Sequence, residues 1–239
     1  MGNPTRFVNG VSTQAVGRNL GNFPLPDPSE CCVDFEDFNQ YVAGDWTVTN
    51  TTSHNTIGLV AASSTIPAGG VIGLVGGASS VSTDVAAIQA TPLNMYFSTS
   101  NQVWFYTHLK LDSATNNQVM VGIGSSAATV APTDGIYFNK ASGGATVDFV
   151  VRKSSTSTTV SSVATLTAAT DVELGFYYNG KDTVYAYVNE QCVGSTTTLT
   201  NLPAAVAMAP FIAMKLGAGA PTTATLYSDF LLAAQDRSF

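Results

Sequence analysis

Side chains that could carry out acid–base chemistry are sparse in this chain, and their closest grouping is the segment DFEDF at residues 34–38. If this segment is a strand, Asp34 and Glu36 share one face and Asp37 points the opposite way. Two carboxylates on one face can hydrolyse a glycosidic bond, one as acid and one as nucleophile. No third acid follows in register, so we interpret these residues as solvated or turn-forming acids.

The remaining reactive side chains are dispersed, and we interpret three further acids as isolated: Asp148, Glu173 and Glu190. His54 and His108 are the only histidines, and a metal site needs several converging donors, so we expect His108 to be packed or hydrogen-bonded. The cysteines have neither a disulfide framework nor CxxC spacing, which indicates buried or idle thiols: Cys31, Cys32 and Cys192. We predict no catalytic, metal-binding or cofactor-binding residue.

Charge excludes one large class of partner. The sequence carries 9 Lys and Arg against 16 Asp and Glu, a formal net charge of −7. Nucleic-acid binding depends on clustered basic side chains, and the few present are scattered. No segment reaches the roughly 18 uninterrupted apolar residues of a membrane span. The first residues lack the apolar core of a signal peptide, so we expect assembly in a cytoplasm, without nucleic-acid or membrane partners.

Short runs rich in Val, Thr, Tyr and Phe follow one another from residue 33 onward, and turn-forming residues separate them. We predict strands at residues 33–38, 45–50, 56–61, 70–76, 94–98, 102–111, 117–125, 134–140, 145–153, 158–166, 171–179, 182–189, 207–216 and 224–234. Residues 82–90 contain at most a short helical turn. This pattern predicts an all-β protein, a two-sheet antiparallel sandwich or barrel.

Alternation predicts two unlike faces on the longest strands, because successive side chains point oppositely. One face is apolar core, and the other carries the aromatic residues Trp104, Tyr106, Tyr177, Tyr185 and Tyr187. Exposed rings of this kind can stack on sugars. Rings on neighbouring strands can equally pack against each other or against a partner subunit, so both interpretations stay open.

The segment FYYNGKDTVYAYVNEQCVGS at residues 176–195 contains a strand, an Asn-Gly turn, a second strand and a short second turn. It resembles the meander near the end of concanavalin-A-like lectin/glucanase jelly rolls, where a closing strand such as LYSDFLLAA follows. CVDFEDF and DWTVTN resemble the first strands of the same domain. The resemblance covers residues 32–236 and implies a two-sheet antiparallel jelly-roll β-sandwich. Glycanases of this family alternate acids along a central cleft strand as Glu-x-Asp-x-Glu, a pattern that DFEDF does not continue.

Residues 1–31 differ from the rest of the chain, because they show no sustained periodicity and end in alternating prolines that favour an extended path. We predict an extended N-terminal arm over residues 1–31 and a jelly-roll domain over residues 32–239. We expect the arm to become ordered on a neighbouring molecule. Its anchors for a partner would be the apolar residues Phe7, Val8, Val11, Val16, Leu20 and Phe23.

Charged residues make up 10% of the sequence, against roughly 25% in an average soluble domain. A neutral, hydroxyl-rich sandwich with an arm and no reactive cluster resembles bacteriophage capsid decoration (cement) proteins. The resemblance implies a non-enzymatic virion protein on the capsid surface, bound to the major capsid protein or another shell protein as a homotrimer. The alternatives are a carbohydrate-binding module of a phage tail fibre or adhesin, which would bind a glycan, and, less favoured, a glycan hydrolase.

Overall fold

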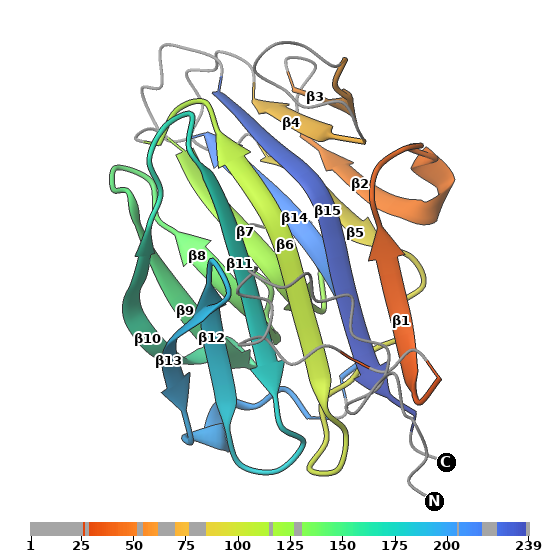
Figure 1. Ribbon diagram of the computed structural model, residues 1–239, viewed down its shortest axis with the longest axis vertical. Coiled ribbons are helices and arrows are strands. Elements are labelled where there is room, and N and C mark those ends of the chain that lie inside the picture. The colour runs from red at the N-terminus through yellow and green to blue at the C-terminus, as the bar shows by residue number, and fades with distance from the viewer. Residues whose placement is uncertain are drawn as a thin grey trace, which may run out of the picture.

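The computed structural model describes residues 26, 29–51, 55–61, 70–76, 85–114, 117–126, 131–204, 206–216 and 224–237. Over these residues two antiparallel sheets lie face to face (Figure 1). The all-β sandwich predicted from the sequence is therefore confirmed. None of these residues belongs to a helix with the length and hydropathy of a membrane span.

The eight-stranded sheet has the order β13-β12-β11-β6-β15-β4-β3, and β1 also pairs with β15. Its strands are β1 (Cys31–Glu36), β3 (Thr56–Leu59), β4 (Ile72–Gly76), β6 (Val103–Leu111), β11 (Asp171–Tyr178), β12 (Val184–Val188), β13 (Gln191–Thr196) and β15 (Ala224–Asp236). The strand that closes the chain, β15, therefore lies beside β6 near the middle of this sheet (Figure 1).

The seven-stranded sheet has the order β10-β9-β8-β7-β14-β5-β2. Its strands are β2 (Trp46–Asn50), β5 (Val85–Ala90), β7 (Asn117–Gly124), β8 (Gly135–Lys140), β9 (Thr146–Lys153), β10 (Thr156–Thr165) and β14 (Ala209–Leu216). Two short 3-10 turns complete the regular structure of the described residues, η2 (Ala43–Asp45) and η3 (Leu199–Asn201).

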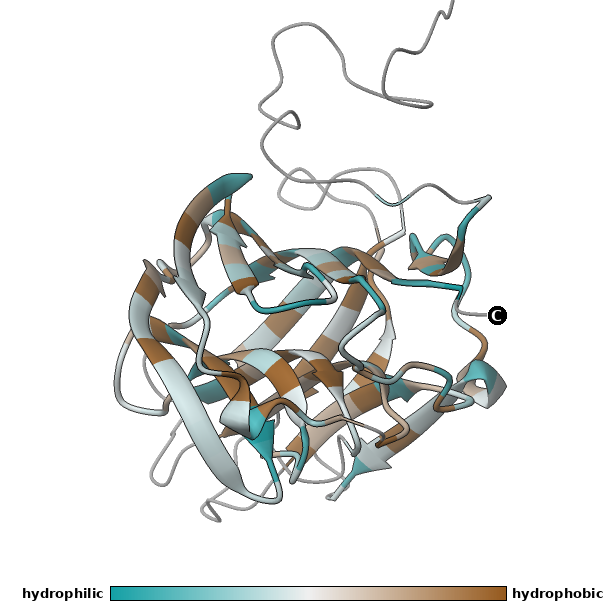
Figure 2. Cartoon of the chain, turned by 90° about the horizontal axis from the view of Figure 1, so that it is seen from below, coloured by the Kyte–Doolittle hydropathy of each residue, from teal (hydrophilic) through white to brown (hydrophobic). Residues whose placement is uncertain are grey.

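The core fills the space between the two sheets. Hydrophobic residues recur along the strands of both layers (Figure 2), as expected when alternate side chains of each strand face inward. The ring of Phe176 in β11 stacks on that of Phe105 in β6, with centroids 5.4 Å apart. Its centroid lies 6.0 Å from that of Phe149 in β9, which belongs to the opposite sheet. Burial of each such ring contributes about 1.5–3 kcal/mol, so these contacts join the layers.

The Asn-Gly turn between β11 and β12 forms as the sequence predicts. The side-chain oxygen of Asn179 accepts the backbone N–H groups of Lys181, Asp182 and Thr183, each at 3.0 Å. Gly180 has a φ of +70°, which a glycine adopts without strain. The following turn between β12 and β13 also uses two residues with positive φ, which matches the twist of the flanking strands.

Three assignments of the sequence analysis are wrong, and β13 was not among the predicted strands. Residues 85–90 form β5 instead of a helical turn, and its alternate residues Ala86, Ile88 and Ala90 belong to the core. Residues 94–98 form isolated bridges at two positions instead of a strand. Cys31, which we assigned to the arm, is the first residue of β1 and pairs with the end of β15.

Lys140 is a buried charge that the sequence analysis did not find. It is 1% exposed, and its Nζ donates to the backbone and side-chain oxygens of Asn117 at 2.6 and 2.9 Å. A third acceptor is the Ala141 carbonyl at 3.4 Å. Burial lowers the pKa of Lys140 to about 8. The N–H groups of the Lys140 ammonium thus donate to uncharged oxygen atoms. These hydrogen bonds connect the end of β8 to the start of β7.

The closeness of β7 and β8 depends on Gly122, where a Cβ would lie 2.3 Å from the Ile136 carbonyl oxygen and 2.5 Å from Tyr137 Cα. Overpacking against backbone costs about 1–3 kcal/mol, and we expect Gly122→Ala to lower the unfolding free energy by about 2 kcal/mol or more. Gly58 of β3 has no atom within 4 Å of a built Cβ, so Gly58→Ala should change it by less than about 0.5 kcal/mol. Denaturant unfolding measures both, and equal effects would contradict this packing.

Candidate functional site

Strand register assembles an aromatic surface on the outward side of the eight-stranded sheet. Tyr177 of β11 lies opposite Trp104 of β6 on one side and Tyr185 of β12 on the other. Tyr106 and Tyr187 lie in the adjacent row, separated by one residue of β11. Directly opposed residues point to the same side of a sheet. The five aromatic residues predicted from the sequence to share a face therefore do so.

Strands β15 and β1 extend this surface. Leu232 of β15 lies between Tyr106 of β6 and Phe35 of β1, and the neighbouring row repeats the arrangement. We call the whole surface the aromatic face. Its members are Cys31, Val33, Phe35, Trp104, Tyr106, Tyr177, Tyr185, Tyr187, Phe230, Leu232 and Ala234.

The rings of the aromatic face pack against one another. Trp104 and Tyr177 stack with centroids 5.4 Å apart, and Tyr177 and Tyr185 stack at 6.1 Å. Phe230 continues the array at 5.6 Å from Tyr106. Pairs of this kind contribute about 0.5–1.5 kcal/mol beyond the area they bury. Ring packing therefore stiffens the central strands from outside the core.

Exposure varies across the aromatic face. Trp104 and Tyr106 are each 5% exposed and Tyr187 is 7% exposed, although all three point away from the core. At the margin formed by β1, Val33 is 36% exposed and Phe35 is 59% exposed. The centre of the face is thus withdrawn from water, and its margin is open.

Two phenol groups of the face donate hydrogen bonds to polar side chains. The Tyr106 hydroxyl donates to the Glu173 carboxylate, and the Tyr177 hydroxyl donates to the Gln102 side-chain oxygen. Burial raises the pKa of Tyr106, and the bond to Glu173 raises it further. Burial also raises the pKa of Tyr187 to about 12. The hydroxyl groups of Tyr106 and Tyr187 therefore stay protonated at neutral pH.

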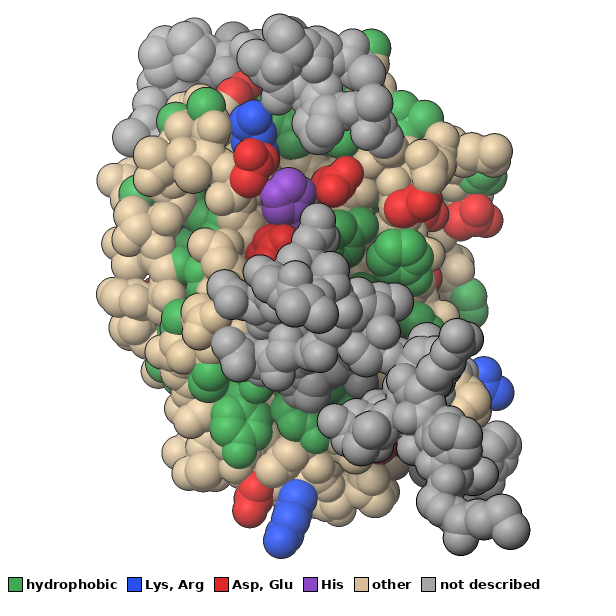
Figure 3. All heavy atoms as spheres, viewed as in Figure 1, with side chains coloured by type: hydrophobic (Ala, Val, Ile, Leu, Met, Phe, Trp, Pro, Cys, Tyr) green, Lys and Arg blue, Asp and Glu red, His purple; other side chains and the backbone are tan. Residues whose placement is uncertain are grey.

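A cluster of charged groups surrounds His108 at one end of the face. Its Nδ1 lies 3.6 Å from an Asp229 carboxylate oxygen, and its Nε2 lies 3.8 Å from an Asp171 carboxylate oxygen. Glu173 is directly opposite His108, and Lys110 is opposite Asp171. Figure 3 shows acidic side chains around a histidine on this side of the molecule. His108 also stacks on Phe230 with ring centroids 6.4 Å apart, so it is packed as the sequence analysis expects, but among charges that the sequence analysis did not predict.

The interpretation of Glu173 as isolated is wrong. It accepts the Tyr106 hydroxyl and neighbours His108 across the strand pair. The alternating acids Asp171 and Glu173 were the available signal, since they share a face of β11. Asp229 could not be added from the sequence, because it sits where the register of β15 shifts against β6.

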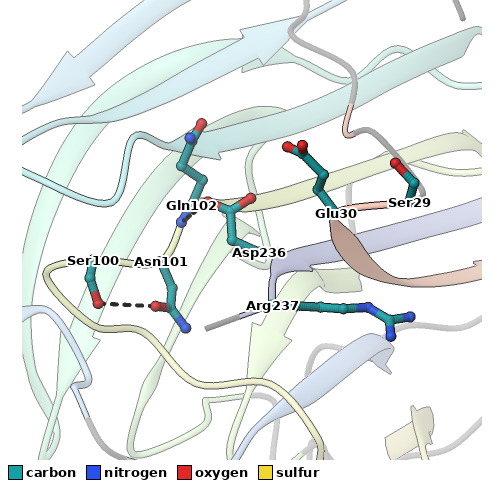
Figure 4. Close-up of a pocket in the computed structure, with 7 residues that line it drawn as sticks. All are labelled: Ser29, Glu30, Ser100, Asn101, Gln102, Asp236 and Arg237. Carbon is teal, nitrogen blue, oxygen red and sulfur yellow. Dashed lines mark hydrogen bonds between the residues drawn. The ribbon is translucent and has the colours of Figure 1, made fainter. Parts of the chain in front are cut away.

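A polar pocket of about 510 Å³ lies at the other end of β6 (Figure 4). It is lined by Ser29, Glu30, Ser100, Asn101, Gln102, Asp236 and Arg237. The Asp236 carboxylate accepts the Gln102 backbone N–H at 3.1 Å and the Cys31 thiol at 3.5 Å. Asp236 therefore holds together the ends of three strands, and its carboxylate is engaged in that role.

Asp34 and Glu36 share one side of β1, as predicted. They lie opposite Ala233 and Leu231, whose side chains belong to the core, so they point away from the aromatic face. Glu36 accepts the backbone N–H of Phe38 at 2.8 Å, and burial raises the pKa of Asp34. Glu36 therefore acts in the turn that follows the strand.

No family model and no curated protein sequence matches the chain. Solved structures are similar to it in fold. An endo-1,3-β-glucanase from Streptomyces sioyaensis is 9% identical, with a TM-score of 0.62 over 90% of this chain and 99% of that one. A protein of unknown function from Shewanella oneidensis MR-1 is 14% identical, with a TM-score of 0.61 over 88% and 90%. The carbohydrate recognition domain of Emp47p is 8% identical, with a TM-score of 0.58 over 89% and 100%.

The chain has the concanavalin-A-like lectin/glucanase fold. The jelly-roll resemblance found in the sequence is confirmed. Identities this low establish the arrangement of strands and nothing about activity. Because the similar structures include a hydrolase and a carbohydrate recognition domain, the function depends on the side chains that this chain places on the concanavalin-A-like sandwich.

The outward side of the seven-stranded sheet carries an apolar cluster that includes Tyr137 and Phe211, and Ala131 from the β7–β8 connection packs against it. Among the described strand residues on this side of the sandwich, Asp148 is the only acid. Its carboxylate accepts the Ser162 backbone N–H at 2.9 Å. The alternating acids of glycanases with the concanavalin-A-like fold are therefore missing from these strands.

The described residues contain no group of three His, Cys, Asp or Glu side chains that could hold a metal ion. Cys31 is buried, Cys32 and Cys192 are exposed, and none of the three is part of a disulfide among the described residues. His54 lies outside the described residues. The predicted anchors of the arm also lie outside them: Phe7, Val8, Val11, Val16, Leu20 and Phe23.

The raised pKa of Tyr106 gives the concanavalin-A-like domain a pH-dependent stability. The Tyr106 phenol ionises at about pH 10 in the unfolded chain and at a higher pH in the folded one. The stabilisation from its protonated form is therefore complete below about pH 10 and is lost as the pH rises further. We expect the unfolding free energy from urea titrations to fall more steeply above about pH 10 for the wild type than for Tyr106→Phe. Phe149→Leu, a core substitution in the opposite sheet without a titratable group, should keep the wild-type slope. Identical slopes for Tyr106→Phe and the wild type would refute the assignment.

Proposed function

We propose that the protein is a non-enzymatic structural protein of a virus particle, which decorates a capsid shell through broad and weakly charged contacts. The aromatic face carries the proposal. It carries apolar and aromatic side chains across β12, β11, β6, β15 and β1, and those at the margin formed by β1 are open to a partner. A surface of this extent and low charge suits adhesion over area.

The positions of the acids support a role without catalysis. Glycan hydrolysis needs two carboxylates on either side of the scissile bond. Asp148 binds a backbone amide, and Asp34 and Glu36 lie on the core side of β1. Asp171 and Asp229 lie on either side of the His108 ring. That ring fills the space in which a substrate would have to lie between them.

Composition and resemblance support the virion setting. Charged residues make up only 10% of the sequence, and the pattern resembles that of phage decoration proteins. The partner in this proposal is the major capsid protein or another shell protein. The protein would sit on the capsid surface as a homotrimer after assembly in the host cytoplasm.

The open margin of the aromatic face is the first place to test the proposal. We expect the full-length protein to co-sediment with particles purified from cells that produce it, and Phe35→Asp to weaken this binding by about tenfold, or about 1.4 kcal/mol. Leu59 is also exposed, at 49%, but lies in β3, so Leu59→Asp should bind like the wild type. Particles that carry none of the protein would refute the proposal, and equal losses in both variants would remove the margin from the interface.

Carbohydrate binding is the second candidate, favoured by the stacked and partly buried rings of Tyr177 and Tyr185 and by the fold shared with a carbohydrate recognition domain. If the decoration proposal is right, we expect a glycan array without signal and no turnover of polysaccharides. Glycan binding that is lost in Tyr185→Ala would establish the second candidate instead. Polysaccharide turnover that is lost in Glu173→Gln would establish a hydrolase.

A further inference from the structure

The centre of the aromatic face is protected from water more strongly than its margin. Trp104, Tyr106 and Tyr187 are 5–7% exposed, whereas Phe35 on the same face is 59% exposed. Side chains on the outward side of a surface sheet are ordinarily accessible, and monomers seldom leave a large apolar patch bare. The centre therefore has the character of a surface that binds an apolar segment.

The sequence of residues 1–25 has the complementary character. It contains spaced apolar residues, two arginines and no acid, so its formal charge is +2. The whole chain carries −7, which leaves −9 on residues 26–239. Carboxylates stand at one end of the face, where Asp171, Glu173 and Asp229 surround His108. Arg6 and Arg18 are the basic residues that could approach them, and guanidinium–carboxylate contacts are strong when partly shielded from water.

The segment is attached at the edge of the face. Residue 30 is anchored by its carbonyl, which accepts the Arg237 backbone N–H at 3.0 Å, and Cys31 is itself a member of the face. Five strands spaced about 4.8 Å apart span about 20 Å, whereas 25 extended residues reach about 80 Å. A tethered segment also has an effective concentration in the millimolar range. The chain's own segment therefore outcompetes the same segment of a separately diffusing molecule at micromolar concentration.

We propose that residues 1–25 bind across the aromatic face of their own chain, with apolar side chains over Trp104, Tyr106 and Tyr187 and the arginines toward the carboxylates around His108. The sequence analysis expected the arm to order on a neighbouring molecule, whereas the aromatic face offers a site within the same chain. Phe35 at the margin stays free for a shell partner. The inference does not require the proposed role in a virus particle, and it confines the shell contact proposed above to the open margin of the face.

Trp104 reports on this contact directly, because the chain has two tryptophans and the other, Trp46, lies in the core. In the full-length Trp46→Phe protein we expect weak quenching of Trp104 by acrylamide. The full-length variant that also carries Phe7→Ser, Val11→Ser and Leu20→Ser should show stronger quenching and red-shifted emission, with unchanged circular dichroism. The control Asn3→Ser, Ser12→Asn and Asn19→Ser changes polar residues of the same segment and should match its parent.

Two further measurements vary the charge of the segment and the concentration of the protein. Arg6→Glu with Arg18→Glu should also raise the quenching, whereas dilution of the parent protein should leave it unchanged. Strong acrylamide quenching of Trp104 in the Trp46→Phe protein, or unchanged quenching in the triple serine variant, would overturn the proposal. Protection of Trp104 that disappears on dilution would place the segment on another copy and would overturn it too. If Trp46→Phe does not fold, the wild type gives the same comparison, because buried Trp46 adds a constant signal.

Discussion

The register between β6, β11 and β15 is the constraint on which the rest of the molecule depends. It puts Phe105 and Phe176 on the core side, where they stack at 5.4 Å, and Trp104 and Tyr177 on the outward side, where they stack at the same separation. A slip by one residue would exchange the two sides of a strand. Both sides of these strands are apolar, so the register is held by ring packing on each side and by the hydrogen bonds that the Tyr106 and Tyr177 hydroxyl groups donate.

A sheet that is apolar on both sides presents a problem of solubility. Exposed apolar strands attract other chains, and this protein has few charges with which to oppose that tendency. On the outward side of this sheet, described charged side chains gather in the cluster around His108 and in the pocket beside Asp236. The middle of the face is thereby left apolar, and any surface that covered it would have to avoid the charged groups on either side.

The sequence predicted what local alternation determines. The two faces of the long strands and the turn at Asn179 follow from neighbouring residues, and both are confirmed. β5 was missed because Ala86, Ala87 and Ala90 have little preference for strands and are buried on both sides, so the segment shows no alternation. The cluster around His108 was missed because it combines three strands, and the shift in register at β15 that brings in one of its acids has no local signature.

The same sandwich can serve hydrolysis or adhesion, and the outward side chains decide which. On the seven-stranded sheet, Tyr137 and Phe211 are buried against each other at 6.3 Å. A pair of carboxylates in their place would lose that packing and would pay for desolvation, which amounts to several kcal/mol per ion unless each is paired. Catalysis on this sheet would thus require rebuilding a packed layer instead of exchanging a few surface residues. The apolar outward surfaces of the two sheets therefore disfavour a catalytic cleft with paired carboxylates and favour adhesion. The proposed function thus rests on side-chain packing as well as on the positions of the acidic residues.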